Sequence, residues 1–333
     1  MKANNIPLLQ VKDLCVEYHI PAGVFRAVDK LSFSLEKGKS LGIVGESGCG
    51  KTTAMLALLR LLPESGRIVE GEVLLEVEGE QKDILRLSPS ELQEFRWNKI
   101  AMVFQGAMNA LNPVRTVGSQ IREALIFHNS VPKNKVEEEI DLLLDLVGVS
   151  PAYKNRYPHQ YSGGMRQRAM IAMALACRPD VLIADEPTTA LDMMVQAQIL
   201  DLLKKLQHEL DLAVVMVTHD LGAVADLCDD VLVMYAGMMA EMAPVETIFE
   251  KPVHPYTRRL ISAFPDIDNP KADLASISGY PPALNNLPKG CRFEPRCELS
   301  TDKCILEIPD VIEVSKGHYC RCPISLSDYK VAK

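Results

Sequence analysis

The sequence lacks a strongly basic segment and any long apolar run. Its formal net charge is −8, from 36 Lys and Arg against 44 Asp and Glu, which argues against nucleic acid as a partner. No run approaches the roughly 18 apolar residues of a membrane span, and the start, MKANNIPLLQVKDL, has no apolar signal core. Long repeats and low-complexity tracts are also missing. These absences predict a soluble cytoplasmic protein that can still dock on a membrane protein.

Alternating strand and helix patterns predict an α/β fold. The chain has 333 residues, 47% of them hydrophobic, enough for one large domain and a small one. Short apolar runs typical of strands fall at residues 8–45, 71–80, 180–187 and 212–220. Helical patterns occupy most of residues 90–175, and a further one at 194–210 would connect two parallel strands. Pro, Asn and Gly become frequent after residue 250 and regular patterns fade, so we predict domains at 1–250 and 251–333, the second small, irregular and rich in cysteine.

The segment GESGCGKT, from Gly45 to Thr52, fits the phosphate-binding pattern G-x-x-x-x-G-K-[ST]. An apolar strand pattern precedes it and a helical pattern follows, as this loop requires. Its glycines let backbone N–H groups surround phosphate oxygens, Lys51 would reach the β- and γ-phosphates, and the Thr52 hydroxyl would bind Mg²⁺. The residues predicted to contact ATP here are Gly45, Ser47, Gly48, Cys49, Gly50, Lys51, Thr52 and Thr53.

Two further motifs complement this loop. VLIADEP places Asp185 and Glu186 at the end of an apolar strand, where Asp185 would bind the Mg²⁺ shell and Glu186 would polarise the attacking water. YSGGM places Ser162, Gly163 and Gly164 at a helix start, a position that binds anions. Taken alone, each has a plainer interpretation, a polar strand end for the first and a capped helix for the second.

The order and spacing of these three motifs resemble those of the ATP-binding-cassette ATPases. YSGGM is similar to the family signature LSGGQ, from which it departs at Tyr161 and Met165. The resemblance implies a nucleotide-binding domain with a phosphate-loop α/β core, an antiparallel β subdomain and a helical subdomain at about 90–175. It also implies a head-to-tail dimer, homo- or heteromeric, in which each ATP lies between one subunit's phosphate loop and the other's signature.

The same resemblance assigns roles to other residues. Gln105 would sense Mg²⁺ and the attacking water, His219 would contact the γ-phosphate, and residues 190–192 would cross the dimer interface. Tyr18 is our candidate for stacking on adenine, with Phe25 as its rival. An ordinary half-buried strand residue is the alternative for Tyr18, because aromatics are common in strands.

Four longer segments resemble the ATPase subunits of dipeptide and oligopeptide importers. They are FQGAMNALNPVRTVGSQI at 104–121, YSGGMRQRAMIAMAL at 161–175, HPYTRRLISAFP at 254–265 and GYPPALNNLPKGCRFEPRC at 279–297. The resemblance implies a peripheral subunit on the cytoplasmic face of the membrane, bound to permeases after Gln105 and served only indirectly by an external solute-binding protein. Relatives also import nickel or oligosaccharides, so peptide is inferred from resemblance alone.

Two other function classes compete with this interpretation. A soluble cassette ATPase of DNA repair or translation usually has two cassettes or a coiled-coil insertion, and neither is visible here. A regulatory module with an inactive nucleotide site is disfavoured by the intact Lys51, Asp185, Glu186 and His219.

The tail concentrates five of the nine cysteines, while Cys15, Cys49, Cys177 and Cys228 are scattered. Five, six and fifteen residues separate Cys291, Cys297, Cys304 and Cys320. These gaps are wider than in most zinc sites, and four thiolates suit a [4Fe–4S] cluster. The importer resemblance implies that cluster, leaving Cys322 as a spare. Zinc, with His318 as a substitute ligand, and unliganded thiols are the alternatives, and a structural or a redox role remains open.

Overall fold

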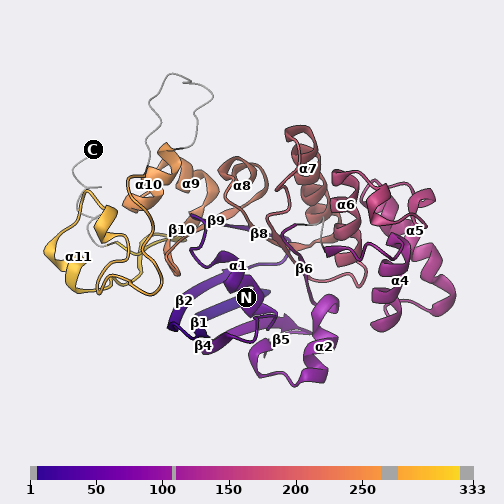
Figure 1. Cartoon of the computed structure of the whole chain (residues 1–333), viewed down its shortest axis with the longest axis horizontal. Helices are drawn as coiled ribbons and strands as arrows, with labels where there is room; N and C mark the ends of the chain where they lie inside the picture. The colour runs from indigo at the N-terminus through magenta and orange to yellow at the C-terminus, as the bar shows by residue number, and fades with distance from the viewer. Residues whose placement is uncertain (1–5, 107–109, 264–276, 323–333) are drawn as a thin grey trace, which may run out of the picture. The chain divides into compact units, whose positions relative to one another are not determined.

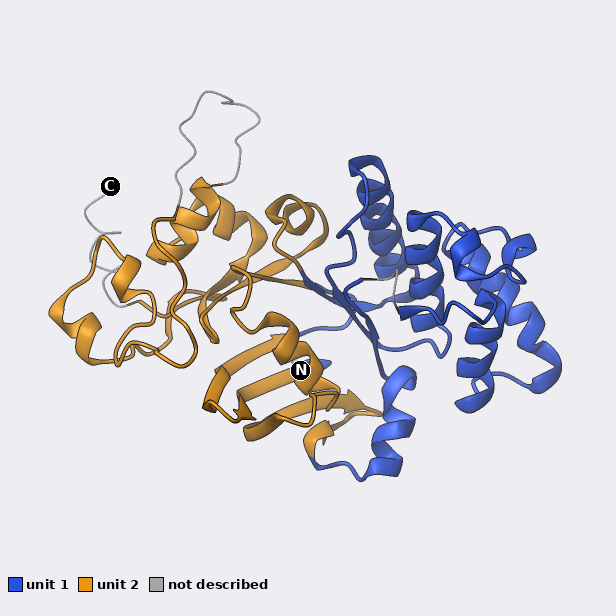
Figure 2. Cartoon of the chain, in the orientation of Figure 1, with its two compact units in different colours: residues 1–9, 35–40, 86–217 blue, residues 10–34, 41–85, 218–333 orange. Residues whose placement is uncertain are grey.

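The computed structural model describes residues 6–106, 110–263 and 277–322. Two compact units make up the chain (Figure 2). The first unit contains residues 1–9, 35–40 and 86–217. The second unit contains residues 10–34, 41–85 and 218–333. Each unit is described by itself below. Ala107, Met108 and Asn109 of the predicted permease-binding segment, and Phe264 and Pro265 of the importer-like segment, lie outside the described residues.

One sheet of the second unit has the strand order β2-β1-β4-β5 (Figure 1). Its strands are β1 (Leu9–Ile20), β2 (Gly23–Leu35), β4 (Gly66–Val77) and β5 (Glu80–Asp83). β4 and β5 pair antiparallel, and the two turn residues, Glu78 and Gly79, have φ of 56° and 88°. Positive φ at both positions matches the twist of a two-residue hairpin. This sheet therefore contains an antiparallel hairpin, as an antiparallel β subdomain would.

The other strands of this unit run in the order β11-β12-β10-β9-β3. They are β3 (Ser40–Val44), β9 (Asp230–Tyr235), β10 (Met238–Pro244), β11 (Ile312–Ser315) and β12 (His318–Cys320). β3 and β9 are parallel, and β10 pairs antiparallel with both β9 and β12. The C-terminal region is thus joined by backbone pairing to the sheet that carries β3. The proposed domain boundary near residue 250 stays a prediction.

The helices of the second unit are short. They are α1 (Lys51–Leu58), α8 (Leu221–Leu227), α9 (Val245–Glu250), α10 (Pro255–Ser262) and α11 (Asp302–Leu306). α10 begins with a proline, which suits the first helical position, and the His254 side chain accepts a hydrogen bond from the Tyr256 N–H as its cap. Burial lowers the pKa of His254 to about 4, so at neutral pH this imidazole is neutral and available as an acceptor.

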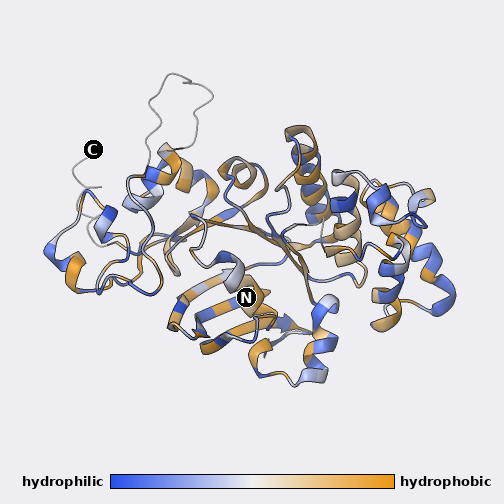
Figure 3. Ribbon diagram, in the orientation of Figure 1, coloured by the Kyte–Doolittle hydropathy of each residue, from blue (hydrophilic) through white to orange (hydrophobic). Residues whose placement is uncertain are grey.

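The first unit contains the parallel strands β6 (Ile100–Val103), β7 (Val181–Asp185) and β8 (Ala213–Val217), in the order β8-β7-β6. Every residue of β7 and β8 is buried, which explains their uninterrupted apolar sequence. Figure 3 colours these strands mainly as hydrophobic. The chain connects β7 to β8 through α7 (Met193–Leu210), so the strand–helix–strand order predicted for 180–220 is confirmed.

The remaining helices of the first unit are α2 (Pro89–Asn98), α4 (Val117–Phe127), α5 (Val136–Leu146) and α6 (Gly163–Ala174). They fall in the span predicted to be mostly helical, and β6 interrupts that span. No helix in the described ranges is long and apolar enough to cross a membrane.

Candidate nucleotide-binding site

The phosphate-binding loop is closely packed against neighbouring backbone. Gly45 has φ of 150°, and a Cβ there would lie 2.2 Å from the Met234 carbonyl oxygen. Gly50 has φ of 102°, and its Cβ would lie 2.4 Å from the Ala27 carbonyl oxygen. Both positions exclude any other residue, by backbone conformation and by space. The close packing against β9 and β2 therefore requires glycine at positions 45 and 50.

Lys51 is buried at the first position of α1. Its Nζ donates hydrogen bonds to the carbonyl oxygens of Gly45 at 2.6 Å and Glu46 at 3.2 Å, so the ammonium lies within the turn of the loop. Ser47 and Gly48 are exposed on the loop, and the Thr52 hydroxyl follows at the start of α1. The buried Lys51 ammonium, the glycine backbone and the Thr52 hydroxyl suit a nucleoside triphosphate and its Mg²⁺.

Tyr18 lies beside this loop in the same unit. Its hydroxyl is 3.3 Å from the Thr53 hydroxyl, so the half-buried β1 residue touches the first turn of α1. Phe25, the rival aromatic, is also half-buried, on β2. Both rings are partly accessible, and the choice between them stays a prediction.

The first unit brings Gln105 and Glu186 into direct contact. The Glu186 Oε2 accepts hydrogen bonds from Gln105 Nε2 and from the Thr189 hydroxyl, both at 2.8 Å. Glu186 directly follows β7 with φ of 48°, a strained conformation for a residue with a side chain and one found often at functional sites. Asp185, the preceding residue, is 1% exposed. The two acids expected at the strand end thus occupy different environments, with Asp185 buried and Glu186 half-buried.

The signature segment forms the capped start of α6, as predicted. The Ser162 hydroxyl accepts a hydrogen bond from the Met165 N–H at 3.2 Å. A Cβ on Gly164 would lie only 2.6 Å from Val195 Cγ1, whereas one on Gly163 would be 3.4 Å from Leu191 Cδ2. Gly164 therefore lets α6 approach Val195 of α7 closely, whereas the space beside Gly163 would accept a methyl group.

The departure from the family signature at Tyr161 has a structural explanation. Tyr161 is 3% exposed, and its hydroxyl donates a hydrogen bond to the Tyr153 carbonyl oxygen at 2.9 Å. Burial raises its pKa to about 12. This side chain is a core residue, so its identity leaves the exposed Ser162 unaffected.

His219 lies in the second unit, exposed between β8 and α8. The next residue, Asp220, caps α8 by accepting hydrogen bonds from the Gly222 and Ala223 N–H groups at 2.9 and 3.2 Å. The second unit thus carries the phosphate loop, Tyr18 and His219. The first unit carries Gln105, Asp185, Glu186 and the signature.

Comparisons with known proteins identify the family of this chain. The family model described as "ABC transporter" matches residues 28–189, and "Oligopeptide/dipeptide transporter, C-terminal region" matches residues 240–304. The chain is 46% identical to the oligopeptide transport ATP-binding protein OppD of Haemophilus influenzae, covering 98% of this chain and 99% of that protein. The chain belongs to the ATP-binding subunits of oligopeptide and dipeptide ABC transporters.

Other relatives support this placement of the peptide-transporter ATPase. It is 45% identical to the dipeptide transport ATP-binding protein DppD of Bacillus subtilis, over 95% of this chain and 94% of that one. A dimeric, post-hydrolysis structure of the ATP-binding cassette MJ0796 with ADP and phosphate has a TM-score of 0.62 and 28% identity. It covers 71% of this chain and 98% of the cassette. The ATPase fold is therefore shared with a cassette that has been observed as a dimer.

Four of the five tail cysteines lie within electrostatic range of one another in this ATPase. Burial, together with the neighbouring thiols of Cys322, Cys304 and Cys297, raises the pKa of Cys291 to about 11. Burial also raises the pKa of Cys297, with Cys322 and Cys304 again among its neighbours. Cys322, which the sequence left as a spare, is therefore beside the group.

The arrangement of the tail side chains does not by itself form a metal site. Within the described part of the chain, no three or more His, Cys, Asp or Glu residues are placed to hold a metal ion. Cys320 is buried on β12, where it lies opposite Glu241 of β10 in the antiparallel strand pairing. His318, the alternative zinc ligand, has its Nε2 2.7 Å from Glu241 Oε1. The donor set suits a cluster chemically, and the thiols would have to converge to bind one.

Sequence reasoning missed three residues around the phosphate loop. Glu46 stands at a variable position of the motif, Tyr256 lies on α10, and Arg296 directly precedes Cys297 in the tail. Arg296 pairs with Glu46 across 250 residues of sequence. No local pattern reports a pairing over that separation.

Proposed function

We propose that this ATPase powers peptide import by a water attack on ATP that Glu186 and Gln105 position. The observation that carries this proposal is the hydrogen bond between these two side chains. It fixes the carboxylate at the end of β7, where it can polarise water. His219 would contact the γ-phosphate, and Lys51 would balance the charge of the phosphates. Thr52 and Asp185, with Gln105, would hold Mg²⁺, which neutralises charge developing on the phosphate oxygens.

We further propose that the signature of this chain acts on the nucleotide of a second ABC ATPase subunit. Met193 and Met194, next to residues 190–192, are 86% and 73% exposed. Exposed apolar side chains beside a predicted interface loop favour a surface that a partner covers. The cassette MJ0796, described as dimeric, supports the formation of a dimer.

The proposed permease contact follows Gln105. Phe104, just before Gln105, is 41% exposed, and Val114, within the segment that the importer resemblance assigns to the permease, is 79% exposed. Binding there would keep the subunit at the cytoplasmic face of the membrane. An external solute-binding protein would then act on this chain only through the permeases.

The substrate class is tested by transport. The complete transporter, with its permeases, second ATPase and solute-binding protein, is reconstituted in vesicles with ATP on the ATPase side. We expect ATP-dependent uptake of a labelled oligopeptide, and no uptake when Lys51 is replaced by Ala. Uptake of nickel or an oligosaccharide with no peptide uptake would contradict the peptide assignment.

The finer proposal for the tail is a [4Fe–4S] cluster that stabilises the C-terminal region. It rests on the spacing of Cys291, Cys297 and Cys304 and on the proximity of their thiols. The sequence assigns the fourth thiolate to Cys320, and the position of the Cys322 thiol makes that residue its rival. The cluster would replace part of the core that a short, irregular region cannot build.

Metal analysis tests the cluster. Protein purified without oxygen should contain iron and sulfide in equal amounts and show the brown colour of an iron–sulfur protein. Cys320→Ser and Cys322→Ser, compared side by side, should identify the fourth ligand by loss of iron in one of them. Stoichiometric zinc without iron would replace the cluster with the zinc alternative, and the absence of both metals would reject either site.

A further inference from the structure

A bidentate ion pair joins the C-terminal region to the phosphate-binding loop. Arg296 Nη1 donates to Glu46 Oε2 at 2.7 Å, and its Nη2 donates to Glu46 Oε1 at 3.0 Å. The two side chains are 4% and 25% exposed. Two parallel charge-assisted hydrogen bonds fix direction as well as distance, and limited exposure reduces their screening by solvent.

Arg296 is held in place by its own surroundings. Its Nε donates to the Ser278 carbonyl oxygen at 2.9 Å, and Nη2 donates to the Gly279 carbonyl oxygen at 3.2 Å. Nη1 also donates to the Tyr235 hydroxyl at 3.2 Å. The guanidinium is thus fixed by the C-terminal region and by β9, and Glu46 meets a group that is already oriented.

The backbone of Glu46 is held from the same side. Its N–H donates to the Tyr256 hydroxyl at 3.0 Å. The ring of Tyr256 is fully buried, with its centroid 4.6 Å from that of Tyr235 and 5.4 Å from that of Phe293. Tyr256 of α10 and Arg296 of the cysteine-containing loop therefore hold Glu46 through both its backbone and its side chain.

Glu46 in turn contacts Lys51, the residue predicted to bind phosphate. The carbonyl oxygen of Glu46 accepts a hydrogen bond from Lys51 Nζ, so moving Glu46 also moves an acceptor of the lysine. We propose that Arg296 is a positioning residue for ATP, holding the phosphate loop in its binding conformation through Glu46. This inference rests on the assignment of residues 45–52 as the nucleotide site, and it requires no metal in the tail.

The test measures the affinity of the full-length subunit for a fluorescent ATP analogue. Arg296→Gln should weaken binding by about tenfold, because the loop loses a charge-assisted bidentate contact. Arg296→Lys should recover only part of the loss, since one ammonium cannot match the planar fork. Glu46→Gln should have a similar effect, and the double variant should be no weaker than either single one.

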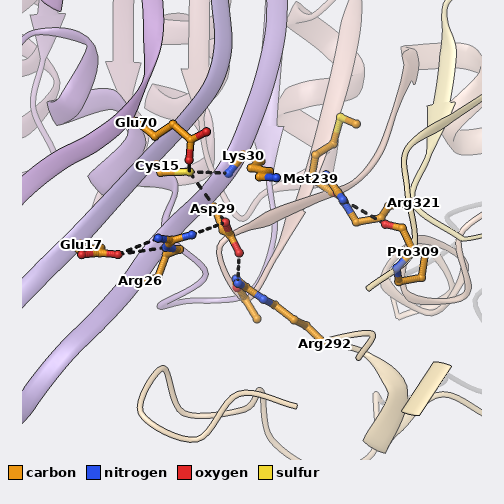
Figure 4. Close-up of polar contacts among 11 residues, drawn as sticks. Cys15, Glu17, Arg26, Asp29, Lys30, Glu70, Met239, Arg292, Pro309 and Arg321 are labelled. Atoms are coloured by element: carbon orange, nitrogen blue, oxygen red, sulfur yellow. Dashed lines mark hydrogen bonds and ion pairs between the residues drawn. The ribbon is translucent and has the colours of Figure 1, made fainter. Parts of the chain in front are cut away.

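Arg292 provides the matched control. It lies four positions before Arg296 in the same loop, is 7% exposed, and pairs with Asp29 and the Ala236 carbonyl oxygen instead of Glu46 (Figure 4). Arg292→Gln should lower the thermal stability and leave the affinity of the folded subunit unchanged.

Two results would overturn the inference. One is wild-type affinity in Arg296→Gln, and the other is an equal loss in Arg292→Gln, which would mean that general docking of the region matters and not this contact. Failure of the wild-type subunit to bind the analogue would instead reject the nucleotide site itself, so the two failures are distinguishable.

Discussion

At the scale of single residues, the site depends on positions where space or backbone conformation restricts which residue can stand. Gly45 and Gly50 sit against carbonyl oxygens that leave no space for a Cβ, and Glu186 is held with a positive φ. Strain of this kind persists only where the surroundings impose it. The pattern of glycines was readable from the sequence, whereas the positive φ of Glu186 was not, because no residue type in the motif signals it.

Gly164→Ala tests the close approach of α6 to α7. We expect a loss of about 1–3 kcal/mol of unfolding free energy, because the new methyl group collides with the stiff, β-branched Val195. Urea denaturation of the subunit measures the change.

Two companion variants make this measurement specific. Val195→Ala in the Gly164→Ala background should restore most of the lost stability, and Gly163→Ala should cost little, since its Cβ would be in ordinary contact with Leu191. A Gly164→Ala protein as stable as the wild type would refute the packing argument.

At the scale of elements, the sequence predicted best where the pattern was long and uniform. β7, α7 and β8 were anticipated because two fully buried strands flank an eighteen-residue amphipathic helix. β6 was missed because its four residues, IAMV, follow α2 almost directly. Its signal was nevertheless present, since the apolar run ends in Gln105 as β7 ends in its acids.

The strands of the tail were missed for a different reason. β11 and β12 contain four and three residues, too few for a periodic pattern. They form because β10 offers a partner, pairing Glu241 with Cys320 and Met242 with Tyr319. The sequence therefore indicated irregular structure where tertiary pairing produces a sheet edge. The Arg296–Glu46 contact also escaped prediction, because it joins residues that are far apart in the sequence.

At the scale of the whole molecule, the chemistry is divided between the two units. The phosphate loop and His219 belong to the second unit, while Gln105, Glu186 and the signature belong to the first. On the proposed assignments, we expect ATP hydrolysis to use residues of both units and, by family resemblance, the signature of a second subunit. Nucleotide binding would then select a closed state, and hydrolysis would release it.

Glu186→Gln in the complete transporter tests this account most directly. The amide keeps the size of the side chain and loses the charge that polarises water, so the affinity for ATP should be retained. Removing this base should reduce ATP turnover by at least about 100-fold, and peptide uptake should fall with it. Lys51→Ala is the control for lost nucleotide binding. Turnover and uptake at the wild-type rate in Glu186→Gln would contradict the account.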